Sequence, residues 1–402
     1  MQVPHLVHQG TARINEQLER AYGLYRERVG YRAPIRIVGY RGFGTDDAIF
    51  LKGRVLADPA IESALDDPGL RNFFNMLRRY RATSVPDARI RVSLNGRHVE
   101  VTADNKGYFD AVVEPGELDN KNGLWHPVKL TLVEPHPNPD VNQEFFDFSD
   151  SVQVPAEARF GVISDIDDTI VHTGATNLMR HARVVLFNSP HTRVPFEGIG
   201  AFYRALQSEQ GTPTNPIWYV SSSPWNIYEL LVEFMEVHEI PLGPIFLKDF
   251  GIDREKFIRA GHIDYKIDRI RRLLRTYPDL PFILVGDSGQ RDPEVYRAVV
   301  EEFSDQIQAV YLRDVAPERV CPVEEIARQI RSSGVDVLLM ADTIAAAEHA
   351  CQLGWIDASD VDAVRDDRRK ERRNVPIGIK AAAKKVGRSL VNLLSYPARA
   401  VR

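Results

Sequence analysis

The stretch FGVISDIDDT, residues 160–169, joins a short apolar run to a cluster of aspartates. The run Phe160–Ser164 has the length and composition of a buried strand, and the aspartates follow at its carboxyl end. From Arg159 onward, further apolar runs alternate with helix-like segments, a pattern typical of a parallel sheet covered by helices. Ligands of such open sheets bind beyond the carboxyl ends of the strands, so the aspartates lie where a site is expected.

The elements expected after Arg159 form one α/β domain with a Rossmann-like parallel sheet, residues 159–358. Strands are predicted at residues 160–164, 217–220, 244–247, 282–285, 309–312 and 335–340. Helices are predicted at residues 199–208, 225–238, 265–277 and 294–303.

The preceding residues 34–154 have a different texture. Short β-type segments are separated by Gly, Pro, Asn and Asp clusters, and RIRVSL and YFDAVV alternate polar and apolar residues. This pattern predicts a small β-sandwich with a helical or irregular insertion at residues 58–81. Residues 1–33 are predicted to form a helical lead-in, and residues 359–402 a basic tail.

Composition limits the classes of protein. Of the 402 residues, 44% are hydrophobic and 27% charged, as in soluble globular proteins, and the formal net charge of -5 gives no sign of nucleic-acid binding. The two cysteines share no metal-ligand spacing. No apolar run has the length of a secretion signal or a membrane span, which predicts a cytoplasmic protein.

Asp165 and Asp167 carry the strongest chemical signal. Their spacing of two places both carboxylates on the same side of an extended backbone. One carboxylate can attack phosphorus, and the second can protonate the leaving oxygen and then activate water. An aspartate-rich surface turn is the alternative interpretation of these residues alone.

The candidate partners of these carboxylates follow later strands. Ser221 ends one strand and can donate to a phosphate oxygen, and Asp287 ends another and is a hard oxygen ligand suited to Mg²⁺. Lys266 precedes the second of these strands and could neutralise Asp165 and a phosphate, with Lys256 as its rival or a solvated helix position as its alternative.

Helix capping offers a simpler explanation for other residues of these motifs. Ser222 or Ser223 could be the N-cap of the helix that follows them. Asp292 stands directly before Pro293, which fits an N-cap followed by proline at the first helical position. The alternative is that Asp292 supports the metal site.

The order of these motifs resembles the haloacid-dehalogenase phosphatase superfamily over residues 159–345. The strings DIDDTI, YVSSSPWNIYELL, ILVGDSGQRDPEVY and AVYLRDV are similar to the catalytic domain of the actin-patch-associated phosphatidate phosphatases of fungi and their bacterial relatives. The fungal serine motif is SNSP, where this chain has SSSP.

The resemblance implies a role for each matching residue. Asp165 is implied as nucleophile and metal ligand, and Asp167 as general acid and base that reaches the metal through its backbone carbonyl. Ser221 and Lys266 are implied to hold the phosphoryl oxygens. The remaining implied positions are Asp287 and, through water, Asp292 at Mg²⁺, with Thr169, Ser222 and Ser223 on the substrate side.

The segments that could carry a cap over the site are short. His172–Pro195 and Pro241–Asp264 each hold about two dozen residues, whereas an independent domain needs at least about 50. An open site suits a phosphate on a large molecule such as a membrane lipid or a protein, unless the β-domain is a lid. The tail Arg365–Arg402 holds twelve Lys/Arg against three Asp/Glu, so it is either a segment lying on anionic membrane, a solvated tail or a packed helix.

Together these features predict a Mg²⁺-dependent phosphatase that converts phosphatidate, or another phosphorylated lipid, to its alcohol and phosphate. It is expected to be cytoplasmic or peripheral at the membrane. The alternatives are a phosphatase of a phosphoprotein or a soluble phosphomonoester, and a binding protein with a vestigial enzyme domain.

Overall fold

The structure, a computed structural model, describes residues 35–57, 83–118, 123–135, 146–155, 157–170, 195–209, 211–248, 262–316 and 319–374. Several expectations lie outside these residues. They are the helical lead-in at 1–33, the insertion at 58–81, Lys256, most of the two short cap segments, and the tail beyond residue 374.

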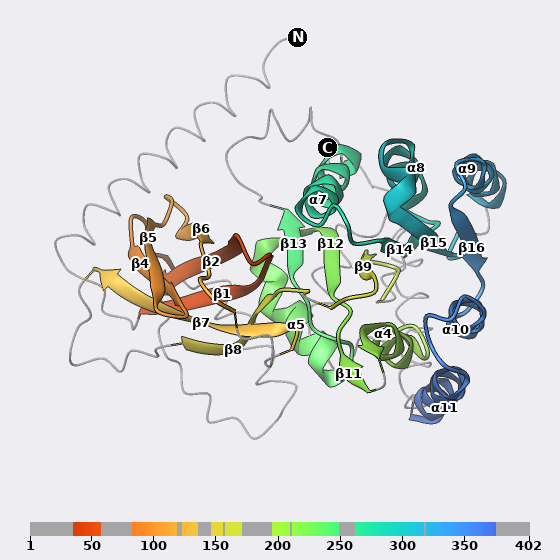
Figure 1. The fold of residues 1–402 in the computed structure, drawn as a ribbon, viewed down its shortest axis with the longest axis horizontal. Helices are drawn as coiled ribbons and strands as arrows, with labels where there is room; N and C mark the ends of the chain where they lie inside the picture. Colours follow the sequence, from red (N-terminus) through yellow and green to blue (C-terminus); the bar gives the residue numbers. More distant parts are fainter. Residues whose placement is uncertain are drawn as a thin grey trace, which may run out of the picture.

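The second half of the chain contains a parallel sheet of six strands in the order β13-β12-β9-β14-β15-β16 (Figure 1). Every pair of neighbours in it is parallel. The strands are β9 (Gly161–Ser164), β12 (Ile217–Pro224), β13 (Ile245–Lys248), β14 (Phe282–Asp287), β15 (Ile307–Arg313) and β16 (Asp336–Met340). The expected mixed α/β architecture with a parallel sheet is therefore confirmed.

Helices cover both faces of this sheet, as Figure 1 shows. On one face lie α7 (His262–Thr276), α8 (Asp292–Phe303) and α9 (Val320–Ser332), which share one buried cluster. On the other lie α4 (Ile199–Gln207), α5 (Tyr228–Val237), α10 (Thr343–Gln352) and α11 (Ala358–Asn374).

Strand β14 illustrates how the sequence produces this layering. Ile283 and Val285 belong to one buried cluster, and Phe282 and Leu284 belong to the other. Because successive side chains of a strand point to opposite faces, an unbroken apolar run buries both faces of the sheet.

The first half of the chain forms a separate sheet of eight strands. They are β1 (Ile35–Gly44), β2 (Ile49–Ala57), β3 (Thr83–Ser84), β4 (Arg89–Leu94), β5 (Arg97–Thr102), β6 (Tyr108–Val113), β7 (Trp125–Glu134) and β8 (Phe146–Gln153). Hydrogen bonds join them in the order β3-β2-β1-β8-β7-β4-β5, with β6 on β2. Because β6 also lies against β5 near the other end, the sheet curls around its core, and the two separate sheets of the expected sandwich are not confirmed.

The curled sheet packs against the parallel-sheet domain mainly through β1. The Tyr40 ring stacks on Trp225 with 4.6 Å between ring centroids, and Arg36 forms an ion pair of 2.9 Å with Glu229. The Tyr277 hydroxyl donates to the backbone of β1 nearby. These contacts are buried or partly buried, so the two domains share an interface beside β13.

The boundary expected at residue 359 falls inside α11. Val361 and Val364 are buried in the core beside α4, and Arg368 bridges Glu197 and Asp342 at 3.2 and 2.6 Å. The first part of the expected basic tail is therefore a helix packed on the domain. Among the residues that the structure describes, no helix combines the length and apolar character needed to cross a membrane.

Candidate active site

The carboxyl ends of the three central strands bring the predicted side chains together. Asp165 directly follows β9, and its backbone N–H donates to the carbonyl of Val285 on β14 at 2.9 Å. Ser221 lies on β12 and Asp287 ends β14, so both come from strands that neighbour β9. Parallel pairing thus gathers at one edge residues that are far apart in the sequence.

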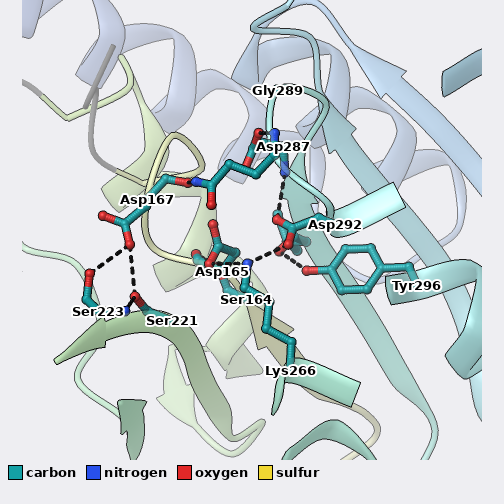
Figure 2. A network of polar contacts seen from close by, with 12 residues as sticks. Ser164, Asp165, Asp167, Ser221, Ser223, Lys266, Asp287, Gly289, Asp292 and Tyr296 are labelled. Carbon is teal, nitrogen blue, oxygen red and sulfur yellow. Dashed lines mark hydrogen bonds and ion pairs between the residues drawn. The ribbon is translucent and has the colours of Figure 1, made fainter. Parts of the chain in front are cut away.

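Lys266 lies between two buried carboxylates (Figure 2). Its Nζ is 2.8 Å from Oδ1 of Asp165 and 2.5 Å from Oδ1 of Asp292. Burial opposes the charge of Lys266, but the two carboxylates outweigh it and raise its pKa above the ordinary value. The ammonium group is therefore held charged against the first aspartate of the motif.

Two carboxylate oxygens beside this lysine have no hydrogen-bond partner among the described residues. They are Oδ2 of Asp165 and Oδ2 of Asp287, and both are buried. Asp165, Asp287 and Asp292 each place an oxygen within 4.8 Å of the others. Burial and the negative charge of Asp292 raise the pKa values of Asp165 and, to about 8, of Asp287. Orphaned carboxylate oxygens crowded together fit a hard divalent cation such as Mg²⁺.

Mg²⁺ is expected to raise the melting temperature of the protein by several degrees, because it would neutralise carboxylates that now repel one another. Asp287→Asn should largely abolish that shift. The measurement is a thermal melt with and without millimolar Mg²⁺ and with EDTA. Asp305→Asn, on the 3₁₀ turn Ser304–Gln306, is the control. If Mg²⁺ raised the melting temperature equally in both variants, Asp287 would not be a ligand of the ion.

Asp167 occupies a different position from Asp165. Its Oδ2 accepts hydrogen bonds from the hydroxyls of Ser221 at 2.9 Å and Ser223 at 3.0 Å. Asp167 is only partly buried, and Ser222 beside it is also partly exposed. The second carboxylate of the motif is therefore less deeply buried than Asp165, so it could exchange protons with a substrate.

The structure does not support the alternative in which the serines and Asp292 only cap helices. The 3₁₀ turn Trp225–Ile227 follows Pro224 and has no side-chain cap. Helix α8 starts with Asp292 itself, after Arg291, and again no side chain caps it. Instead, Oδ2 of Asp292 accepts the N–H of Asp287 at 3.2 Å while Oδ1 accepts from the lysine.

The turn after β9 positions the first motif. Asp168 has a left-handed backbone with a φ of 58°, which aspartate tolerates better than most residues. Thr169 is fully buried, and its hydroxyl has no hydrogen-bond partner in the described part of the chain. The expectation that Thr169 supports the loop or the substrate stays a prediction.

Two residues of the site were missed in the sequence. Gln290 donates its side-chain amide to the carbonyl of Asp167 at 2.9 Å and its backbone N–H to Asp287 at 2.6 Å. Arg319 donates to the carbonyls of Ser288, Gly289 and Gln290, and so fastens the loop after β14. Gln290 lies inside the motif GDSGQRD, which was the available signal, whereas Arg319 lies outside every motif, four residues after the string AVYLRDV.

Comparison with known proteins shows what the domain that holds this constellation is similar to. Residues 160–314 match the model of the phosphatidate phosphatase APP1 catalytic domain. The strings DIDDTI, YVSSSPWNIYELL and ILVGDSGQRDPEVY lie inside the matched residues, and AVYLRDV ends one residue beyond them. The resemblance inferred from the sequence is thereby confirmed for this part of the chain.

Individual relatives cover the same domain. The phosphatidate phosphatase APP1 of Saccharomyces cerevisiae is 37% identical over 154 residues, which are 38% of this chain and 25% of the yeast protein. An uncharacterized protein of Schizosaccharomyces pombe is 26% identical over 40% of this chain and 27% of its own length. The chain thus spans about a quarter of the length of these two relatives.

Among solved structures, a carbohydrate acetylesterase from Xanthomonas citri aligns with 67% of this chain and 65% of its own at 13% identity. Its TM-score of 0.24 is too low to support a comparison of folds. The assignment of the APP1-like catalytic domain therefore rests on sequence similarity.

Proposed function

We propose that the chain is a Mg²⁺-dependent phosphatase that uses an aspartyl-phosphate intermediate and hydrolyses phosphatidate to diacylglycerol and phosphate. The observation that carries this proposal is the environment of Asp165. One of its oxygens is bound by Lys266, and the other is buried beside Asp287 and has no hydrogen-bond partner in the part of the chain that the structure describes. The match to the phosphatidate phosphatase APP1 catalytic domain supports the choice of substrate.

In this mechanism a carboxylate oxygen of Asp165 attacks phosphorus, and the bond from phosphorus to the glycerol oxygen breaks. Asp167 donates a proton to that oxygen, and diacylglycerol leaves. Asp167 then takes a proton from water, which attacks the aspartyl-phosphate, so that phosphate leaves and Asp165 is restored.

Electrostatic stabilisation in this mechanism comes from Lys266 and the cation. Lys266 holds its positive charge next to the transferred phosphoryl group. Asp165, Asp287 and the carbonyl of Asp167 would hold Mg²⁺, with Asp292 reaching it through water. Bound there, the cation would neutralise charge on the phosphoryl oxygens. The assignment of the sheet to the haloacid-dehalogenase arrangement belongs to the same proposal.

The deciding assay is release of phosphate from phosphatidate micelles, compared with a panel of soluble phosphomonoesters and a phosphopeptide, each with and without EDTA. We expect phosphatidate to be the best substrate and EDTA to abolish its hydrolysis. If a soluble ester or the phosphopeptide were the best substrate, the proposed phosphatase activity would stand, but phosphatidate would be rejected as the substrate. No hydrolysis of any compound would favour a binding protein with a vestigial site.

Asp167→Asn is expected to slow poor leaving groups far more than good ones, because only a poor leaving group needs a proton in the transition state. A loss of about 10²–10⁴-fold is expected for an alkyl phosphate, and a much smaller loss for p-nitrophenyl phosphate. Steady-state kinetics with both esters measures the difference. Equal losses on the two esters would contradict the role of Asp167 as general acid.

Association with an anionic membrane is also part of the proposal. The basic residues 375–402, which were expected to contribute, lie outside the described residues. Their role therefore stays a prediction, together with peripheral localisation.

A further inference from the structure

A groove of about 370 Å³ runs along the interface between the two domains. One wall comes from β1, β2 and β6 of the curled sheet, and the other from β13, α7 and Trp225. Figure 1 shows β13, together with α5 and α7, on the side of the parallel-sheet domain that lies toward the curled sheet. Helix α7 contributes to both the groove and the candidate active site. Tyr265 lines the groove, and the next residue in the sequence is Lys266.

Three arginines in the lining have no carboxylate partner among the described residues. They are Arg41 on β1 and the pair Arg269 and Arg272 on α7. The Nε atoms of Arg41 and Arg269 are buried without a hydrogen bond. The one carboxylate in the lining, Asp110, is bound by Lys52 at 3.1 Å. The residues that line the groove therefore carry a net positive charge.

Aromatic rings hold two of these guanidinium groups in place. Arg272 lies 4.8 Å from the ring centroid of Phe50 and 5.4 Å from that of Phe43, and Arg269 lies 5.1 Å from that of Tyr265. Stacking on a ring face leaves the N–H donors at the edge of a guanidinium available. The two groups are thus oriented before any ligand arrives.

Two other arginines of the same helix, which do not line the groove, are neutralised by a carboxylate. Arg271 and Arg275 both pair with Glu302, at 2.6 and 3.1 Å. In the groove, by contrast, burial and the charge of Arg269 lower the pKa of Arg272, although the carboxylate of Asp110 partly opposes them. Like charges three residues apart on a helix destabilise it, so a bound anion would relieve this repulsion.

The groove also presents apolar surface at its rim. Val112 lines it and is 57% exposed, the largest exposed fraction among the large hydrophobic residues of the described part of the chain. Phe43 and Trp225 form its buried part. Basic groups combined with aromatic and aliphatic side chains match the boundary between lipid headgroups and acyl chains.

We propose that this groove binds the anionic headgroup of a membrane phospholipid other than the molecule being hydrolysed. Arg41, Arg269 and Arg272 would bind the phosphate oxygens, and Val112 would contact the first acyl carbons. Both domains would then be docked on the bilayer with the neighbouring strand ends close to it. The choice of a lipid over an acidic peptide rests on the proposed function.

The test is binding of the full chain to phosphatidylglycerol/phosphatidylcholine vesicles at low ionic strength, measured by co-sedimentation. The double variant Arg269→Gln/Arg272→Gln is compared with Arg271→Gln/Arg275→Gln, which removes the same charge from positions of α7 that do not line the groove. Each basic residue at an anionic surface contributes about fivefold, so the groove variant should bind roughly 30-fold more weakly. The control variant should bind within about threefold of the unmodified chain.

A second variant, Val112→Ser, changes an exposed side chain and should also weaken vesicle binding without altering the melting temperature. Equal losses of vesicle binding in the groove and control variants would overturn the proposal. Polyglutamate serves as a model of an acidic peptide. If the groove variant lost binding to polyglutamate but still bound vesicles, the groove would bind peptides and the proposal would also be overturned. Because vesicle binding needs no turnover, this result is independent of the phosphatase assay. Hydrolysis of p-nitrophenyl phosphate should be the same in all of these variants.

Discussion

Asp165→Asn is expected to lower turnover by more than about 10³-fold while the fold is retained. The amide cannot form the acyl phosphate, yet it has nearly the same shape and can still accept the hydrogen bond that Lys266 donates to Oδ1. Steady-state hydrolysis of phosphatidate and far-UV circular dichroism measure the two parts of the expectation. Because Asp165 is buried, its substitution could unfold part of the sample and lower activity for that reason alone. A melting curve of the variant shows whether such an unfolded fraction is present.

The matched control is Asp268→Asn, which makes the same chemical change on the exposed side of α7. It should retain full activity. Beryllium fluoride should protect the unmodified protein against heat, since it forms a phosphate-like adduct with an aspartate, and should fail to protect Asp165→Asn. More than about 1% residual activity in Asp165→Asn would contradict the covalent mechanism.

The parallel sheet could be predicted because its strands are locally encoded. The apolar runs that became β9, β12 and β14 are short, continuous and buried on both faces, and each ends in a polar residue of the site. Asp165, Ser221 and Asp287 were therefore predicted from their positions at strand ends. Lys266 was predicted from its place in the motif order, and the structure places it at Asp165.

The interactions that could not be predicted depend on long-range geometry. The local pattern of Asp292 before Pro293 left an N-cap and a role in the site equally open, and only its contacts with Lys266 and the backbone of Asp287 decide for the site. Arg319 contacts the loop after β14 from the start of a helix that was not predicted. A charge–charge or backbone contact across several elements leaves no periodic trace in the sequence.

The composition of the curled sheet and of α11 also limited what could be predicted from the sequence. Strand β8 has the polar sequence FDFSDSVQ and was not predicted, although it joins β1 to β7. Helix α11 contains many charged residues, and it contacts the domain through only two buried valines, Val361 and Val364, together with the ion pairs of Arg368. When so few apolar residues mark an element, tertiary contacts decide its place rather than local pattern.

Lys266→Met is expected to abolish activity and also to destabilise the metal-free protein by about 3–5 kcal/mol, because it leaves buried carboxylates without their cation. The side chain of Lys266 is only 6% exposed and touches both Asp165 and Asp292. Chemical denaturation in EDTA measures the loss. The control Lys129→Met, on the exposed side of β7, should change the free energy of unfolding by less than about 0.5 kcal/mol.

The second-site change Asp292→Asn separates the structural from the catalytic part of this effect. In the Lys266→Met background it removes one of the two uncompensated negative charges, so the double variant should recover part of the lost stability. It should recover no activity, because no positive side chain then faces the transferred phosphoryl group. If the double variant were no more stable than Lys266→Met, the loss would come from the changed packing of the methionine. If Lys266→Met kept substantial turnover, the lysine would hold the aspartates in place without contributing to phosphoryl transfer.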